Sequence, residues 1–196
     1  MIDDRIETFI KKVFLIFGLD KLEGIAERLV RKNYNKGFDD LEATLQSSIN
    51  FVPNERAIHF LKEYSFQNIK GMRDDFVVKL RQQLVEAFIN REGSRQIAKR
   101  VSRVMDITRA RAETIARTES HRAYNVGAMD VAQQSGLKLK KVVYNPSPKT
   151  DICKALVNME PIPINDKFKY GKESWLIPPF HPNCRSRVLY IQEGKS

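Results

Sequence analysis

Apolar residues recur every three or four positions over most of the first 135 residues, which is the spacing of one buried helix face. The clearest stripe is also the first: Ile6, Phe9, Ile10, Val13, Phe14 and Phe17. Further helices are predicted over residues 20–33, 39–50, 54–68, 73–90 and 95–104. Pro53 suits a helix start, and the segment Glu92-Gly93-Ser94 interrupts the pattern before a new N-cap. The pattern therefore predicts an N-terminal helical region, residues 1–90.

A long helix is predicted from Asp106-Ile107-Thr108 to Gln134, because this stretch has a capping signal at its start and contains no proline. Gly136 is placed to end it. Along this helix a narrow face carries residues three or four positions apart, most of them small: Ala112, Ala116, Ser120, Ala123, Gly127 and Val131. We expect another element to pack closely on this face.

The pattern changes after residue 136. Residues 140–144 alternate enough to predict a strand, and prolines concentrate at 146–148, 161–163 and 178–182. The predicted fold is α+β and predominantly helical. Its N-terminal helical region precedes a module, residues 91–196, that holds the long helix and a small strand- and loop-rich unit.

The chain is basic, with 34 Lys and Arg against 24 Asp and Glu and a net charge of +10, which predicts attraction to polyanions. The positive charge is concentrated in residues 91–122 and 138–149. Candidates for non-specific contact with DNA phosphates are Arg95, Lys99, Arg100, Arg103, Arg109, Lys138, Lys140 and Lys141. The alternative is that these charges only solvate helix faces. Neither a membrane span nor a secretory signal is predicted, and we expect no membrane partner.

Three residues are candidate metal ligands: Cys153, His181 and Cys184. Thiolates and imidazole suit Zn²⁺, and the His-x-x-Cys spacing can reach one ion. The set lacks an obvious fourth ligand, for which Asp151 or a water is the candidate. The alternative is that both cysteines are small buried hydrophobes, while His181 bonds to a loop carbonyl or to Glu119.

Two separated segments carry the most specific signal. The first is Ile115-Ala116-Arg117-Thr118-Glu119, followed by Asn125 and Gly127, and the second is Pro178-Pro179-Phe180-His181-Pro182-Asn183-Cys184-Arg185. Together, over roughly residues 90–190, they resemble the head morphogenesis family named after the F protein of phage Mu. Members of that family often carry a pair of cysteines between these segments. Here Thr150 stands where the first of the pair would be, and Ser186 stands where some members have a final cysteine.

The resemblance implies a minor head protein of a tailed bacteriophage, without enzymatic activity, that acts near the portal in head assembly and in genome packaging or delivery. It implies the virion as its location, with the host cytoplasm during assembly. The expected partners are the portal protein, major capsid or other head proteins, and double-stranded DNA bound without sequence preference. We expect these residues to be structural keystones: Arg117, Glu119, Asn125, His181, Asn183, Cys184 and Arg185.

Other classes of function have to be weighed against this one. A zinc-dependent hydrolase or nuclease would use the three candidate ligands with Glu119 as general base, but a carboxylate cluster, a Gly-rich phosphate loop and a Ser-His-Asp order are missing from the sequence. Modules of this family also resemble segments of multi-domain bacterial toxins, in which another domain would carry the activity, so a toxin-related module is a further alternative. A DNA-binding regulator would use a helix-turn-helix between Ser94 and Arg117, with its turn at Met105-Asp106-Ile107.

Overall fold

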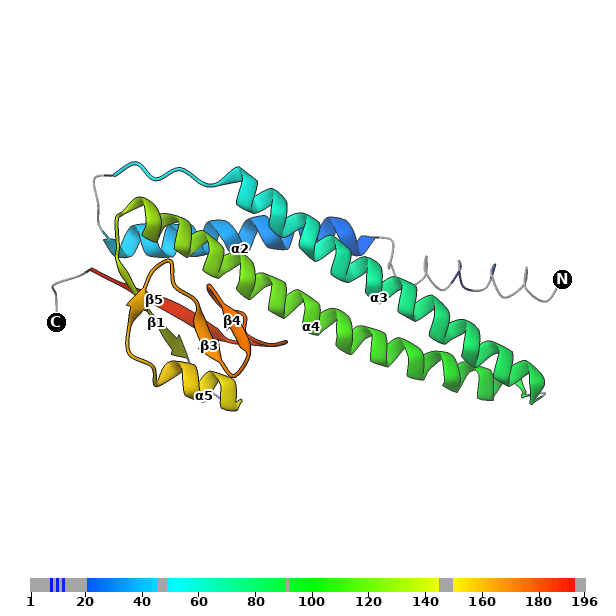
Figure 1. Ribbon diagram of the computed structural model, residues 1–196. Coiled ribbons are helices and arrows are strands. Elements are labelled where there is room, and N and C mark those ends of the chain that lie inside the picture. The colour runs from blue at the N-terminus through cyan, green and yellow to red at the C-terminus, as the bar shows by residue number, and fades with distance from the viewer. Residues whose placement is uncertain are drawn as a thin grey trace. The chain divides into compact units, whose positions relative to one another are not determined.

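The computed structural model describes residues 8, 10, 12, 21–45, 49–90, 92–144 and 150–192. Its helices are α2 (Leu22–Leu45), α3 (Glu55–Ile89), α4 (Ser94–Gln134) and α5 (Asp151–Val157). Its strands are β1 (Leu139–Tyr144), β2 (Ile162–Pro163), β3 (Phe168–Tyr170), β4 (Glu173–Trp175) and β5 (Ser186–Ile191). Figure 1 shows the long helices and the small strand-containing part of the chain. The predicted helical α+β fold is confirmed. Most of the first predicted helix lies outside the described residues, although Thr8, Ile10 and Lys12 are helical.

The helices are longer than predicted. Residues 20–33 and 39–50 belong to the single helix α2, and residues 54–68 and 73–90 belong to α3. In α2, Tyr34 and Phe38 continue the buried stripe through the point where a break was predicted. Each pair of predicted helices therefore forms one continuous helix with a single apolar face.

The helix-turn-helix predicted between Ser94 and Arg117 is wrong, because α4 runs through these residues without a turn. Thr108 does not cap a helix start. Its hydroxyl donates to the carbonyl of Val104 one turn earlier, at 2.9 Å. Val104 and Met105 are buried in the core, so the expected turn is an internal stretch of α4. The structural basis of the DNA-regulator alternative is lost with it.

The chain divides into two compact units that alternate along the sequence. Unit 1 holds residues 1–27 and 63–115, and unit 2 holds residues 28–62 and 116–196. The core of unit 1 joins α3 and α4 through Phe76, Leu80, Leu84, Val104 and Met105, and Ile10 from the N-terminal part of the chain packs with them. The boundary expected near residue 90 coincides with the end of α3, within unit 1. The expected division into functional regions 1–90 and 91–196 stays a prediction.

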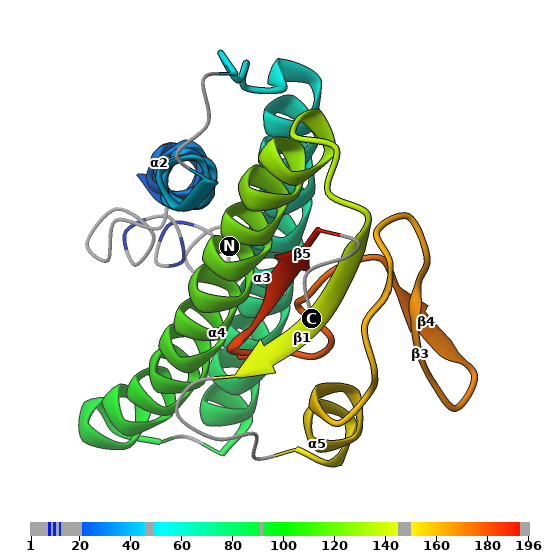
Figure 2. The same ribbon diagram turned by 90° about the vertical axis from the view of Figure 1, so that its left-hand side faces the viewer.

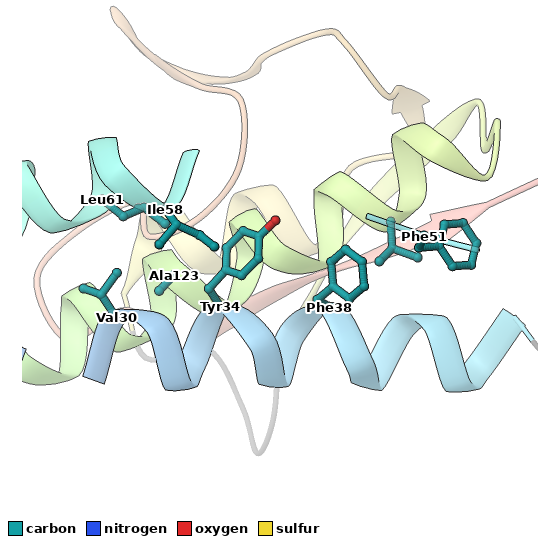
Figure 3. Close-up of a cluster of buried hydrophobic side chains, with 8 residues drawn as sticks. Val30, Tyr34, Phe38, Phe51, Ile58, Leu61 and Ala123 are labelled. Carbon is teal, nitrogen blue, oxygen red and sulfur yellow. The ribbon is translucent and has the colours of Figure 1, made fainter. Parts of the chain in front are cut away.

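The first core of unit 2 lies where α2 meets the start of α3 and the second half of α4. It consists of Val30, Tyr34, Phe38, Phe51, Ile58, Leu61, Ala123 and Val131. Figure 3 shows Tyr34 and Phe38 on the α2 ribbon, with Ile58, Leu61 and Ala123 near them. The small face of α4 allows this approach, since Ala123 and Val131 are fully buried. Close packing on that face is confirmed for these two residues.

The strands of unit 2 form a three-stranded antiparallel sheet, in the order β2-β1-β5, and a separate hairpin of β3 and β4. In the central pair, Val142 lies opposite Val188. The predicted strand at 140–144 is confirmed as β1. Tyr190 and Val188 of β5 pack against Met129 and neighbouring residues of α4, and Figure 2 shows β5 beside this helix. The contacts between β5 and α4 therefore hold the sheet, and the C-terminal loops connected to it, against α4.

None of the helices in the described part of the chain has a stretch apolar and long enough to cross a membrane.

Candidate functional site

The side chains of Cys153, His181 and Cys184 converge at one point of unit 2. Cys153 Sγ lies 3.0 Å from His181 Nε2 and 3.9 Å from Cys184 Sγ. All three ligand atoms lie within 4.8 Å of one another. Both cysteines are buried and their thiols are free, whereas His181 is half-buried. The structure thus brings together the three residues that the sequence singled out as candidate metal ligands.

Local structure explains why these side chains meet. Thr150 is the N-cap of α5, and its hydroxyl accepts a hydrogen bond from the Cys153 amide at 3.4 Å, which places Cys153 in the first turn of the helix. The Cys184 amide donates to the carbonyl of His181 at 3.1 Å, so the His-x-x-Cys segment is folded into a turn. Asn183 within this turn has a φ of 58°, in the left-handed region that asparagine tolerates.

Aromatic side chains pack around Phe180, the residue that precedes the His-x-x-Cys turn. Phe180 is buried and makes edge-to-face contacts with Phe168, at 5.9 Å between ring centroids, and with Trp175, at 5.6 Å. Cys153 and Cys184 belong to the same buried cluster. The two sulfurs are therefore held by packed apolar residues, and their positions follow from the core of the module.

Polar contacts surround the cluster. His181 Nδ1 lies 2.7 Å from the carbonyl oxygen of Pro182, and His181 Nε2 lies 3.1 Å from the hydroxyl of Thr150. The Ser186 hydroxyl donates to Cys153 Sγ at 3.4 Å. Burial raises the pKa of the Cys153 thiol, while the hydrogen bonds from Ser186 and Thr150 oppose this rise. Thr150 and Ser186 thus both lie at the cluster.

The geometry decides several of the expectations about this cluster. Both cysteines are buried and His181 contacts a loop carbonyl, as the alternative without a metal predicted. The ring nitrogens of His181 contact Thr150, Cys153 and Pro182 and not Glu119. Asp151 does not join the three side chains, because its carboxylate is exposed and pairs with Lys154 at 3.2 Å.

A cavity of about 780 Å³ adjoins the cluster. Arg117 and His121 of α4 line one part of it, and Thr150, His181 and Arg185 line another. Among the described residues around it there is no carboxylate. The charged residues around the cavity are therefore basic, and Cys184 and His181 of the cluster form part of its wall.

His121 is a half-buried part of this wall. Its Nδ1 atom has no hydrogen-bond partner within the described residues. Burial lowers the pKa of His121, and the charges of Arg187 and Arg185 lower it further. Arg187 in turn lies over the ring of Tyr124, 4.5 Å from its centroid. The neutral form of His121 is favoured, so the arginines carry the positive charge of the cavity.

Two expected keystones, Asn125 and Asn183, connect α4 to the segments that follow it, and a third, Glu119, forms an ion pair within α4. Glu119 is buried and accepts a hydrogen bond from Arg122 at 3.0 Å; burial raises the pKa of its carboxyl group and Arg122 opposes this rise. The Asn125 side chain donates to the carbonyl of Ser186 at 3.4 Å, and the Asn183 amide donates to the Thr118 hydroxyl at 3.0 Å. These contacts are what residues that hold the module together would make, although their importance for stability stays a prediction.

The candidate DNA contacts fall into two groups. Arg95, Lys99, Arg103, Arg109 and Lys138 are exposed, and Lys141 is half-buried. Lys140, in contrast, is wrong as a DNA contact, because its ammonium group is fully buried. It donates to the carbonyls of Ile164, at 2.6 Å, and Leu176, at 2.7 Å. The alternation of β1 places Lys140 on the same buried face as Val142.

Arg100 also differs from a DNA-facing side chain. Its guanidinium pairs with Glu92 at 2.7 Å and with Glu86 at 2.8 Å, and it donates to Gln83 as well. These contacts join the end of α3 to the start of α4. Arg100 is therefore engaged within unit 1, and its role on DNA stays a prediction.

Comparison with known proteins adds a family to this geometry. Residues 78–189 match the family described as Phage Mu protein F like protein, which is more than half of the chain. No curated protein and no solved structure matches the chain. The matched range contains the cluster, the cavity residues of α4 and most of the sheet. The chain therefore belongs to the Phage Mu protein F like family, and this family suggests a phage head-morphogenesis protein.

Proposed function

We propose that the protein is a minor head protein of a tailed bacteriophage that binds the portal protein and acts in head assembly and in genome packaging or delivery. The observation that carries the proposal is the family match over residues 78–189. The protein is placed in the virion, after assembly in the host cytoplasm, and its role is structural and not enzymatic.

An apolar face of α3 in unit 1 supports the contact with the portal. Val78, Val85 and Ile89 are spaced by seven and four residues, so they lie on one side of the helix. Their side chains are 54%, 41% and 74% exposed. An exposed apolar stripe on a long helix is typical of a protein-protein contact, because its burial removes apolar surface from water. We assign this stripe, Val78–Val85–Ile89, to the portal.

A coexpression experiment tests this assignment. The chain is produced with the portal protein of the same phage, and the complex is quantified by native mass spectrometry. The variant V78D/V85D/I89D should lose portal binding while its melting temperature stays close to that of the wild type. The matched control is V52D/L189D, which places aspartates at exposed apolar positions of unit 2 and should still bind. Undiminished binding of the triple variant would contradict the assignment.

DNA is the second partner that we propose. Arg95, Lys99 and Arg103 are exposed and follow one another at intervals of four residues on α4, so they form a basic row. Such a row can neutralise neighbouring phosphates without reading bases. Contact of this kind suits a protein that lies beside packaged DNA.

A further inference from the structure

We propose that Cys153, His181 and Cys184 bind one Zn²⁺ ion. The residues come from two segments that are separated in sequence, α5 and the turn before β5. Two thiols and an imidazole, with ligand atoms within 4.8 Å of one another, form a ligand set that suits zinc. The inference does not depend on the proposed contacts with the portal or with DNA.

The distance between the two sulfurs agrees with a single tetrahedral ion. With Zn–S bonds of about 2.3 Å and a Zn–N bond of about 2.0 Å, tetrahedral angles place two sulfurs about 3.8 Å apart and a sulfur and a nitrogen about 3.5 Å apart. Cys153 Sγ and Cys184 Sγ are 3.9 Å apart. Cys153 Sγ and His181 Nε2 are 3.0 Å apart, so these two atoms have to separate by about 0.5 Å to share the ion. A disulfide would need the sulfurs at about 2.05 Å.

The hydrogen bonds of His181 prepare its Nε2 atom for a metal. Because a carbonyl oxygen can only accept, the contact of 2.7 Å with Pro182 places the proton on Nδ1. The lone pair of Nε2 then faces Cys153 Sγ. A histidine that binds zinc usually donates its other N–H to a backbone carbonyl, a carboxylate or a water.

Proton balance and the neighbouring hydroxyl favour the same arrangement. Binding of Zn²⁺ replaces the thiol protons of Cys153 and Cys184, and both protons are released to solvent. The Ser186 hydroxyl, which donates to Cys153 Sγ at 3.4 Å, stabilises the resulting thiolate.

The fourth ligand is an oxygen. No fourth cysteine or histidine, and no carboxylate, joins the group in the parts of the chain that the structure describes. The Thr150 hydroxyl lies 3.1 Å from His181 Nε2, and both residues line the cavity. The fourth position therefore takes the Thr150 hydroxyl or a water from the cavity. An ion bound by these residues connects α5, through Cys153, to the turn before β5, through His181 and Cys184.

The test is metal analysis of protein produced in zinc-containing medium and purified under reducing conditions. The wild type should carry one zinc per chain, and chelation should lower its melting temperature. Replacement of zinc by Co²⁺ should give a thiolate-to-cobalt absorption band that is lost in Cys153→Ser and Cys184→Ser. Because these variants can fold poorly, a third variant, Thr150→Cys, completes the ligand set. It should retain zinc at a chelator concentration that strips the wild type.

Thr150→Ala is the matched control, since it removes the hydroxyl of the α5 N-cap without supplying a ligand. It should not hold zinc more tightly than the wild type. Wild-type protein without stoichiometric zinc and without the cobalt band would overturn the proposal. Zinc that persists unchanged in C153S/C184S would overturn it as well, because that metal would be bound elsewhere.

Discussion

The backbone carbonyl of Tyr34 on α2 lies directly against Gly127 on α4, so that a Cβ atom at Gly127 would overlap this oxygen. The approach is mutual, because Gly37 of α2 meets the carbonyl of Tyr124 in the same way. Two helices of unit 2 thus touch through their backbones at two glycines. This contact fixes the part of α4 from which Arg117 and His121 reach the cavity.

Gly127→Ala should therefore destabilise the protein. The added methyl group meets backbone atoms, including Phe38 N at 3.0 Å, and the helices have to move apart. We expect a loss of about 2 to 3 kcal/mol in the free energy of unfolding, measured by urea denaturation. Gly71→Ala is the control, because a Cβ there meets nothing within 4 Å and alanine favours the helix by about 0.5–1 kcal/mol. Equal stability of Gly127→Ala and wild type would refute this close contact.

Tyr34 and Asp130 should be energetically coupled. The Tyr34 hydroxyl donates to the Asp130 carboxylate and accepts from the Asn54 amide at 2.8 Å. Burial raises the pKa of Asp130, and the hydrogen bonds from Tyr34 and Asn54 oppose this rise. Tyr34→Phe should cost about 2 kcal/mol in the free energy of unfolding, since it leaves the half-buried Asp130 carboxylate without its donor and the Asn54 amide without its acceptor. In a cycle with Asp130→Asn, the double variant should lose about 1 kcal/mol less than the sum of the single losses. Strict additivity would contradict the coupling.

Because Lys140 is buried, the free energy of unfolding should depend on pH. Burial lowers the pKa of its ammonium group from 10.5 to about 8. The unfolded chain therefore binds one more proton than the folded protein between these values, and stability should rise with pH across that window. Below about pH 8 both states hold the proton, and the cost of burying the charge is fully present.

Lys140→Met tests this expectation, because methionine has a similar length and does not titrate. Thermal unfolding of both proteins is measured from about pH 7 to about pH 10. Over this range the free energy of unfolding of the wild type should rise by about 2 kcal/mol relative to that of the variant. Other titrating groups are common to the two proteins and cancel in the difference. Parallel curves for the two proteins would show that Lys140 does not titrate in this range.

The basic row of α4 should account for part of the salt dependence of DNA binding. Removal of three phosphate contacts in R95Q/K99Q/R103Q should reduce the slope of log K against log salt by about 2.7. The control K167Q/K169Q/K172Q removes the same charge from exposed positions around β3. Fluorescence anisotropy with a duplex of arbitrary sequence measures both slopes. If both variants lose the same slope, net charge and not the row determines binding.

The sequence was most informative where a single physical signal dominated. Helix existence, the packing face around Ala123 and the strand at 140–144 follow from periodicity, because burial of apolar residues controls them. The three candidate ligands lie together as the sequence predicted, because His181 and Cys184 are close in sequence and Cys153 packs in the same core as Cys184.

The errors arose where local signals compete with tertiary structure. Thr108 and its neighbours have the composition of a capping segment, but packing of Val104 and Met105 keeps α4 intact. Charge alone placed Lys140 on the surface, although its position in an alternating strand is the signal that indicates a buried side chain. The buried Tyr34–Asp130 pair joins residues almost a hundred positions apart, and sequence periodicity carries no sign of such a contact.

The most direct measurement is quantitative mass spectrometry of gradient-purified particles from the phage that encodes this chain, with the portal protein as internal reference. The proposed function predicts that the chain is present at low copy number relative to the major capsid protein and that it stays with the portal when heads are disrupted. Its absence from complete particles and from assembling heads would contradict a role as a minor head protein.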